Sequence, residues 1–241
     1  MKNFIVISLV ISLSTVLNSQ SKQYFDSPFG GGGGYLAGWY VPNVDPINVQ
    51  LKSLGLPELS TSGFYTSGGG GFIYIGLIKN LRLGGMGYSG SMSESSVSNG
   101  VDRESMYSLG GGGLTIEYTL PFVKNFGVSV GAIVGGGNLT VDLFRNSGST
   151  NWDDVWQNLE DGNSANSYKK INKTFWTFTP TINVDIPLYR FVLLRIGAGY
   201  QIAAGGEWKV NNDQSITSVP SDLNGNSFFI HTGIYFGFFS F

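Results

Sequence analysis

The sequence contains no cysteine and only one histidine, His231. Without cysteine the chain cannot form a disulfide framework, present a thiol nucleophile or carry an acylated lipoprotein cysteine. A zinc site built from cysteine and histidine ligands is likewise excluded. We therefore predict no metal site and no cofactor.

Charged residues are also scarce. They make up 12% of the chain, against about 25% in an average soluble protein. The formal net charge is −2, so the chain has no basic excess that would attract nucleic acid. We predict no nucleic-acid partner.

A long apolar run is missing beyond the N-terminal segment, and the mean hydropathy is only +0.06. Residues 1–21 have the layout of a secretory signal peptide, with a positive Lys2 followed by an apolar run over 4–17. Ser19 and Ser21 are the small residues expected just before a cleavage site. An N-terminal membrane anchor is the alternative, although this run is short for a helix of about 20 residues.

Glycine and aromatic residues are abundant: the chain contains 36 glycines, and aromatic residues make up 14% of it. The final stretch, 226–241, combines them in a two-residue period that is typical of a β-strand. One face carries Phe228, Ile230, Thr232, Ile234, Phe236 and Phe238, and the other carries Ser227, His231, Gly233, Tyr235 and Gly237. In water such an apolar edge strand would aggregate, whereas a strand that closes a barrel in lipid has no free edge. We therefore expect the Phe228-to-Phe238 face to meet lipid.

A final strand ending in Phe241 resembles the closing strand of small bacterial outer-membrane β-barrels. In that family the terminal aromatic residue and the alternate residues before it are recognised by the barrel-assembly machinery. Tyr235, Phe239 and Phe241 match this spacing, whereas Gly233 and Gly237 stand where the family has bulkier apolar residues. The resemblance implies a bacterial outer-membrane location, contact with outer-membrane lipid and an assembly signal at Tyr235, Phe239 and Phe241. This matching face is opposite the Phe228-to-Phe238 face, so the two patterns disagree on which face meets lipid.

The same alternation predicts eight strands in all. They cover residues 29–40, 64–77, 81–92, 104–120, 126–143, 173–186, 191–204 and 226–241. Connections after the odd-numbered strands are long and polar, whereas those after strands two, four and six contain only a few residues. This pattern is typical of short periplasmic turns and long external loops, and a soluble β-sandwich, the alternative, has no reason to produce it.

The predicted fold class is therefore all-β. Residues 22–241 are expected to form one eight-stranded antiparallel up-and-down transmembrane β-barrel. The long connections are polar loops, including 93–103, 145–172 and 205–225, with a short helix from Asp45 to Gly55 and a second within 151–161.

Four charged residues fall on the predicted lumen faces: Arg82, Glu117, Asp185 and Arg195. A charge on the lipid face costs about 2–4 kcal/mol at the bilayer midplane, and eight strands enclose a space that side chains fill. We predict that the four residues form an ion-pair cluster that plugs the lumen. Separate solvation of each charge near the rim is the alternative.

Glycine runs occur at 30–34, 68–71, 110–113 and 135–137. Within predicted strands three, four and five, the apolar residues change parity across glycines. A β-bulge at each run would explain the change, and so would strands whose upper parts lie outside the lipid. The glycines themselves could provide curvature, room in the lumen or a flat face for packing against another barrel.

Three functions are compatible with these features. The first is a non-enzymatic structural or surface-binding barrel, whose external loops would meet any ligand or partner. The second is a channel for small or hydrophobic solutes. The third is a lipid-modifying enzyme that uses His231 with a serine and an acid, but no sequence element ties His231 to a serine. We prefer the first.

Overall fold

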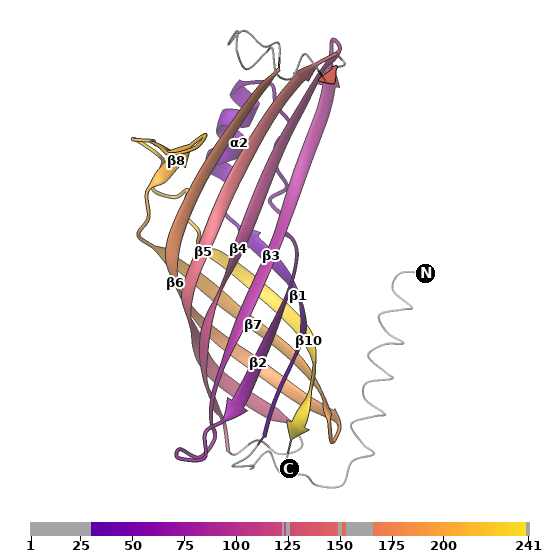
Figure 1. The fold of residues 1–241 in the computed structure, drawn as a ribbon, viewed down its shortest axis with the longest axis vertical. Coiled ribbons are helices and arrows are strands. Elements are labelled where there is room, and N and C mark those ends of the chain that lie inside the picture. Colours follow the sequence, from indigo (N-terminus) through magenta and orange to yellow (C-terminus); the bar gives the residue numbers. More distant parts are fainter. Residues whose placement is uncertain (1–29, 122, 124–125, 149–150, 153–165, 240–241) are drawn as a thin grey trace.

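A computed structural model describes residues 30–121, 123, 126–148, 151–152 and 166–239 (Figure 1). The predicted signal peptide 1–21, Phe241 and most of the second predicted helix, 151–161, lie outside these residues. Within the described ranges, no helix is both long and apolar enough to cross a bilayer.

Eight strands form a closed antiparallel barrel, which confirms the predicted fold class. The barrel strands are β1 (Gly30–Pro42), β2 (Phe64–Tyr74), β3 (Leu81–Ser98), β4 (Val101–Thr119), β5 (Gly127–Ser147), β6 (Ser167–Tyr189), β7 (Val192–Ala204) and β10 (Ser227–Phe239). Neighbours in sequence pair with one another, and β10 returns to pair with β1 from Gly30↔Phe239 to Pro42↔Ser227. The last strand therefore closes the barrel, as predicted.

The two faces of each strand differ as the alternation predicts. In β10, Phe228 is 48% exposed on the outside, whereas its neighbour Phe229 is 1% exposed inside. In β6, the outward Trp176 is 75% exposed, whereas the inward Thr177 is 6% exposed. The Phe228-to-Phe238 face is thus the outer face.

Of the two explanations given for the parity changes, the β-bulge at each glycine run is wrong. Pairing between β3, β4 and β5 continues without a register shift through the glycines, for example at Gly87↔Gly112 and Gly113↔Gly135. The apolar residues change parity because the lumen changes from polar, below the glycines, to apolar, above them. The apolar residues beyond the glycines point inward, and they include Met86, Tyr88, Tyr107, Leu109, Leu139 and Val141.

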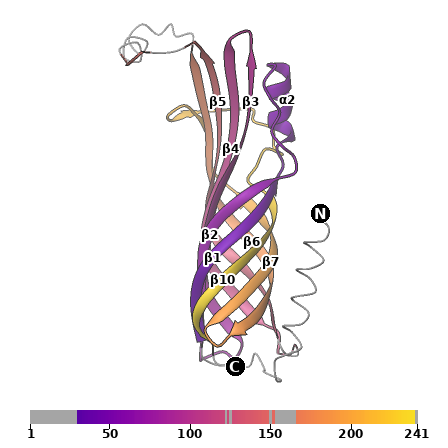
Figure 2. The same cartoon turned by 90° about the vertical axis from the view of Figure 1, so that its right-hand side faces the viewer.

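Strands β3 to β6 extend well beyond the rest of the barrel at its upper end (Figure 2). They contain 18, 19, 21 and 23 residues, whereas the other barrel strands contain 11 to 13. The predicted polar loop 93–103 is instead the tip of the β3–β4 hairpin, and β6 begins at Ser167 rather than at 173. We call the parts of β3 to β6 above the barrel, from about 91–98, 101–109, 139–147 and 167–175, the upper wall.

A two-residue turn makes the β3–β4 hairpin possible. Asn99 and Gly100 both have positive φ, at 52° and 72°. This left-handed backbone matches the twist of a hairpin and favours asparagine followed by glycine.

The inner face of the upper wall is covered by two of the long connections. The first contains α2 (Asp45–Ser53), which buries Ile47 and Leu51. The second, between β7 and β10, was predicted as loop but contains β8 (Trp208–Val210) and β9 (Gln214–Ser215), with β8 pairing to β6. These segments share one apolar core with the wall residues Tyr107, Leu139 and Val141. The upper end is therefore a folded cap.

Candidate functional site: two layers that fill the lumen

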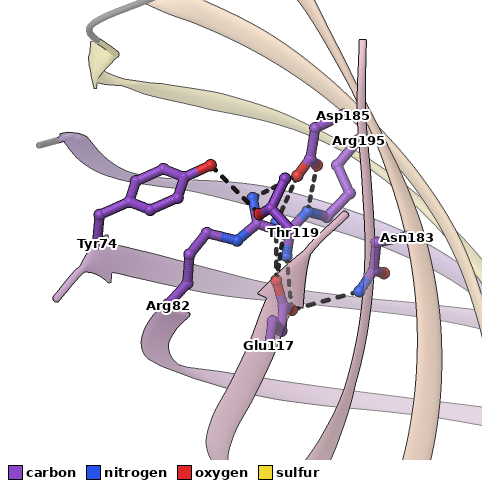
Figure 3. Close-up of polar contacts among 7 residues, drawn as sticks. All are labelled: Tyr74, Arg82, Glu117, Thr119, Asn183, Asp185 and Arg195. Carbon is purple, nitrogen blue, oxygen red and sulfur yellow. Dashed lines mark hydrogen bonds and ion pairs between the residues drawn. The ribbon is translucent and has the colours of Figure 1, made fainter. Parts of the chain in front are cut away.

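The structure brings together all four charged residues that the sequence predicts for the lumen (Figure 3). Arg82 pairs directly with Glu117 across β3 and β4, and Asp185 pairs with Arg195 across β6 and β7. All four lie near the lower end, close to the short turns. Their side chains are 0–5% exposed.

Each carboxylate of this charged cluster lies between both guanidinium groups. Arg82 Nη1 lies 2.5 Å from Asp185 Oδ2, and Arg82 Nη2 lies 2.8 Å from Glu117 Oε2 without hydrogen-bond geometry. Arg195 Nε donates to Asp185 Oδ1 over 2.7 Å, and Arg195 Nη1 donates to Glu117 Oε1 over 3.0 Å. The two positive and two negative charges alternate around a closed ring with no net charge.

Aromatic rings flank the guanidinium groups. The Phe72 ring centroid lies 4.4 Å from Arg82 Cζ and 4.7 Å from Arg195 Cζ, and the Tyr235 ring lies 5.0 Å from Arg195 Cζ. Such contacts favour a cation over an aromatic face, most strongly when water is excluded. Asn183 adds a hydrogen bond of 3.3 Å to Glu117 Oε1. Our sequence reasoning did not assign Phe72 to this cluster, although its inward parity in β2 was available.

A second, uncharged layer crosses the lumen above the charged cluster. Tyr40 stacks on Tyr88 at 4.6 Å and on Phe229 at 4.7 Å between ring centroids. The Tyr88 hydroxyl donates to Gln201 Oε1, whose Nε2 donates to the Gly225 carbonyl over 2.7 Å. This aromatic layer joins β1, β3, β7 and β10, so it closes the lumen from several sides.

The space between the two layers is small. A cavity of about 10 Å³ is lined by Thr181, Asn183 and His231, among others. A volume of this size accommodates about one water molecule. Three polar atoms of these side chains are buried and have no hydrogen-bond partner in the protein: Thr181 Oγ1, Asn183 Oδ1 and His231 Nδ1. The cavity is therefore lined by polar atoms.

His231 lies beside the aromatic layer, with its ring 5.7 Å from that of Phe229. In the part of the chain that the structure describes, no hydrogen bond connects His231 to a serine hydroxyl or a carboxylate. The same part contains no group of three or more histidine, aspartate or glutamate residues that could hold a metal.

Two of the proposed assembly-signal residues, Tyr235 and Phe239, lie on the inner face of β10. Tyr235 and Phe239 are buried, and their rings pack 5.8 Å and 6.0 Å from that of Phe72. In the folded barrel they help to fill the lower lumen. Recognition of Tyr235, Phe239 and Phe241 during assembly stays a prediction.

No protein-family description matches the chain, and no curated protein sequence matches it. Solved structures with a similar fold are bacterial outer-membrane proteins. A major outer membrane protein from Thermus thermophilus is 11% identical with a TM-score of 0.45, over 86% of this chain and 99% of that one. Ail of Yersinia pestis, solved with the heparin analogue sucrose octasulfate, is 8% identical with a TM-score of 0.40, over 87% and 99%. The protease OmpT of Escherichia coli is 9% identical with a TM-score of 0.34, over 92% and 100%. These similarities concern the fold alone, and the fold does not separate an enzyme from a non-enzyme.

Proposed function

We propose that this chain is a bacterial outer-membrane barrel with a closed lumen, and that it holds a folded cap outside the cell for surface binding. The observation that carries the proposal is the filled interior. The charged cluster blocks the lower lumen, and the aromatic layer blocks it again above.

The outer surface supports a membrane location. Apolar side chains face outward on neighbouring strands, among them Ile182, Ile196, Ile230 and Ile234. Inside the barrel the same strands carry polar and charged groups, as lipid requires. Export by the predicted signal peptide 1–21, outer-membrane lipid as surroundings and help from the barrel-assembly machinery all belong to this proposal.

The same geometry favours a non-enzymatic role. The imidazole of His231 lies between two packed layers, and the cavity beside it is about 10 Å³. A substrate that reached this ring would have to displace the aromatic layer. We therefore place binding on the external cap and no catalysis in the lumen.

We expect the wild-type protein to show no stable large conductance in planar bilayers, because either layer alone closes the lumen. Tyr40→Ala with Phe229→Ala should leave the charged cluster as a seal, and Arg82→Ser with Glu117→Ser should leave the aromatic layer. Only the four substitutions together should give measurable current. A stable large pore in the wild type would refute the closed lumen.

We expect Leu51→Ala to loosen the cap without opening the barrel. Leu51 is 1% exposed in the core shared by α2 and the upper wall, and such truncations cost about 2–5 kcal/mol. Limited proteolysis should cut residues 43–63 faster, while heat-modifiable gel mobility stays normal. The control is Leu54→Ala, since Leu54 is the C-cap residue of the same helix but is 63% exposed. Equal cleavage of both variants would contradict a packed cap.

A further inference from the structure

On β4 and β5, the charges of the upper wall are sorted by face. Continuous pairing fixes the parity of every residue up to the tips of β4, β5 and β6. The inner face continues the line of Tyr107, Val141 and Ile171, which belong to or pack on the apolar core. By the same two-residue period, this face carries Arg103, Arg145 and Lys169, whereas the outer face carries Asp102, Glu104 and Asp142.

The three inner-face cations are neighbours. Arg103 lies directly opposite Arg145 across β4 and β5. Lys169 lies opposite Leu143, two residues from Arg145, so it is the diagonal neighbour of Arg145. Directly opposed residues have Cβ atoms about 4.5–5.5 Å apart, and diagonal ones about 7–8 Å. We call Arg103, Arg145 and Lys169 the upper cationic cluster.

Like charges placed directly opposite each other destabilise a sheet. Within the described residues, none of the three cations makes an ion pair or a side-chain hydrogen bond. Glu94 is the acidic residue of β3 on this face, and it lies opposite Ser105, so it is the diagonal neighbour of Arg103. It forms no ion pair with Arg103 in the described structure. Other surface cations do have partners: Lys209 lies 2.5 Å from Asp213, and Lys52 lies 3.8 Å from Glu58.

The outer-face acids do not neutralise the cluster. Asp142 points away from it and lies opposite Lys170. The Tyr168 hydroxyl donates to Asp142 Oδ1 over 2.5 Å, and this hydrogen bond raises the pKa of Tyr168 to about 12. The carboxylate of Asp142 is therefore engaged on its own side of the wall.

The cluster lies far above the apolar belt of the barrel. On β6 the continuous run of outward apolar residues ends at Trp176. The exposed ring beyond that run, Tyr168, donates its hydroxyl to Asp142. Lys169 is seven residues beyond Trp176 along the strand. At about 3.3 Å per residue, this is about 23 Å along the strand. A lipid headgroup at the edge of the apolar belt would therefore have to span this distance to reach the cations, whereas a molecule in the external medium can bind them directly.

We propose that the upper cationic cluster binds a multivalent phosphate- or sulfate-ester anion carried by a glycan in the external medium. This inference rests on the proposed function, because it requires the upper wall to be outside the cell. Guanidinium groups bind such esters through paired hydrogen bonds, and a bridging anion would remove the repulsion between Arg103 and Arg145. The apolar core beneath the cluster holds the strands that carry these cations in place.

The test uses the full mature chain in neutral detergent, with dextran sulfate as the probe and uncharged dextran as the control. We expect the wild type to bind dextran sulfate and not dextran, with affinity falling as salt rises. Arg103→Gln with Arg145→Gln should weaken binding at least tenfold. Lys170→Gln removes one positive charge from the opposite face of the same wall, so it should change affinity less than twofold.

Several results would overturn the proposal. The first is an absence of wild-type binding, and the second is an equal loss with Lys170→Gln. A third is stabilisation of the wild type, but not of the double variant, by phosphatidylglycerol in nanodiscs, which would make the ligand a lipid headgroup. A fourth is binding only after neutralisation of Asp153, Asp154, Glu160 and Asp161 in the adjoining connection, which would mean that carboxylates of the chain occupy the cations. Conductance of the same preparation is recorded in parallel, because a closed lumen without binding defeats this inference alone, whereas an open pore defeats the proposed function.

Discussion

Arg195→Leu is expected to lower the free energy of unfolding by about 3–5 kcal/mol, the usual cost of removing one partner from a buried ion pair. Arg195 donates to both Glu117 and Asp185. Its loss leaves two buried carboxylates with Arg82 as the remaining cation of the ring. Urea unfolding in lipid vesicles, followed by tryptophan fluorescence, measures the change.

A charge-balanced double variant tests whether the ring acts as a unit. Arg195→Leu with Asp185→Leu keeps the Arg82–Glu117 contact of 2.8 Å and leaves no excess charge. We expect it to be more stable than Arg195→Leu alone, because the uncompensated carboxylate is gone. Lys209→Gln, which breaks an exposed ion pair, should leave unfolding unchanged. A double variant less stable than Arg195→Leu would contradict the ring.

Two adjacent glycines of β3 should respond in opposite ways to the same substitution. A Cβ on the inward Gly84 would lie 2.0 Å from the Gly71 carbonyl oxygen, whereas a Cβ on the outward Gly85 would meet nothing closer than 3.4 Å. A backbone oxygen cannot move aside without breaking the ladder. We expect Gly84→Ala to cost about 3 kcal/mol, the upper end of overpacking effects, or to prevent folding.

Gly85→Ala should fold normally and gain up to about 1 kcal/mol, because alanine loses less conformational freedom in a strand than glycine. The pair Gly135 and Gly136 repeats the comparison in β5, with nearest atoms at 2.0 Å and 3.6 Å. Folding yield and heat-modifiable mobility of the four single variants are the measurements. If the inward and outward alanines behave alike, close approach of neighbouring strands does not explain the inward glycines.

The sequence was sufficient to predict the barrel because each strand must separate lipid from lumen. In β6, the alternation of Phe178 and Ile182 with Thr179 and Asp185 reports that separation directly. The four lumen charges followed from the same rule, since a charge has no stable place where the outer face meets lipid. That they form one ion-pair cluster was predicted as well, but which guanidinium group contacts which carboxylate was not, because parity gives a side and not a partner.

The upper lumen was misread for a physical reason. Apolar residues were assumed to face outward, but Tyr107, Leu139 and Val141 face inward, where α2 provides an apolar surface to pack against. Alternation measures a contrast between two faces and does not say which face is inside. The β3–β4 hairpin tip was also missed, because the many serines of 93–103 were interpreted as a polar loop. The signal for it was present, since asparagine followed by glycine at 99–100 strongly favours a two-residue hairpin turn.

The seam between β1 and β10 joins Gly30 to Phe239, residues from opposite ends of the described chain. Its pairing cannot form until nearly all of the polypeptide has been synthesised and delivered to the membrane. Contacts of such long sequence separation form slowly, since the whole intervening chain must be ordered before they are gained. Until then the apolar faces of the strands stay uncovered, so a chain exported as we propose would be prone to aggregation before it reaches the bilayer.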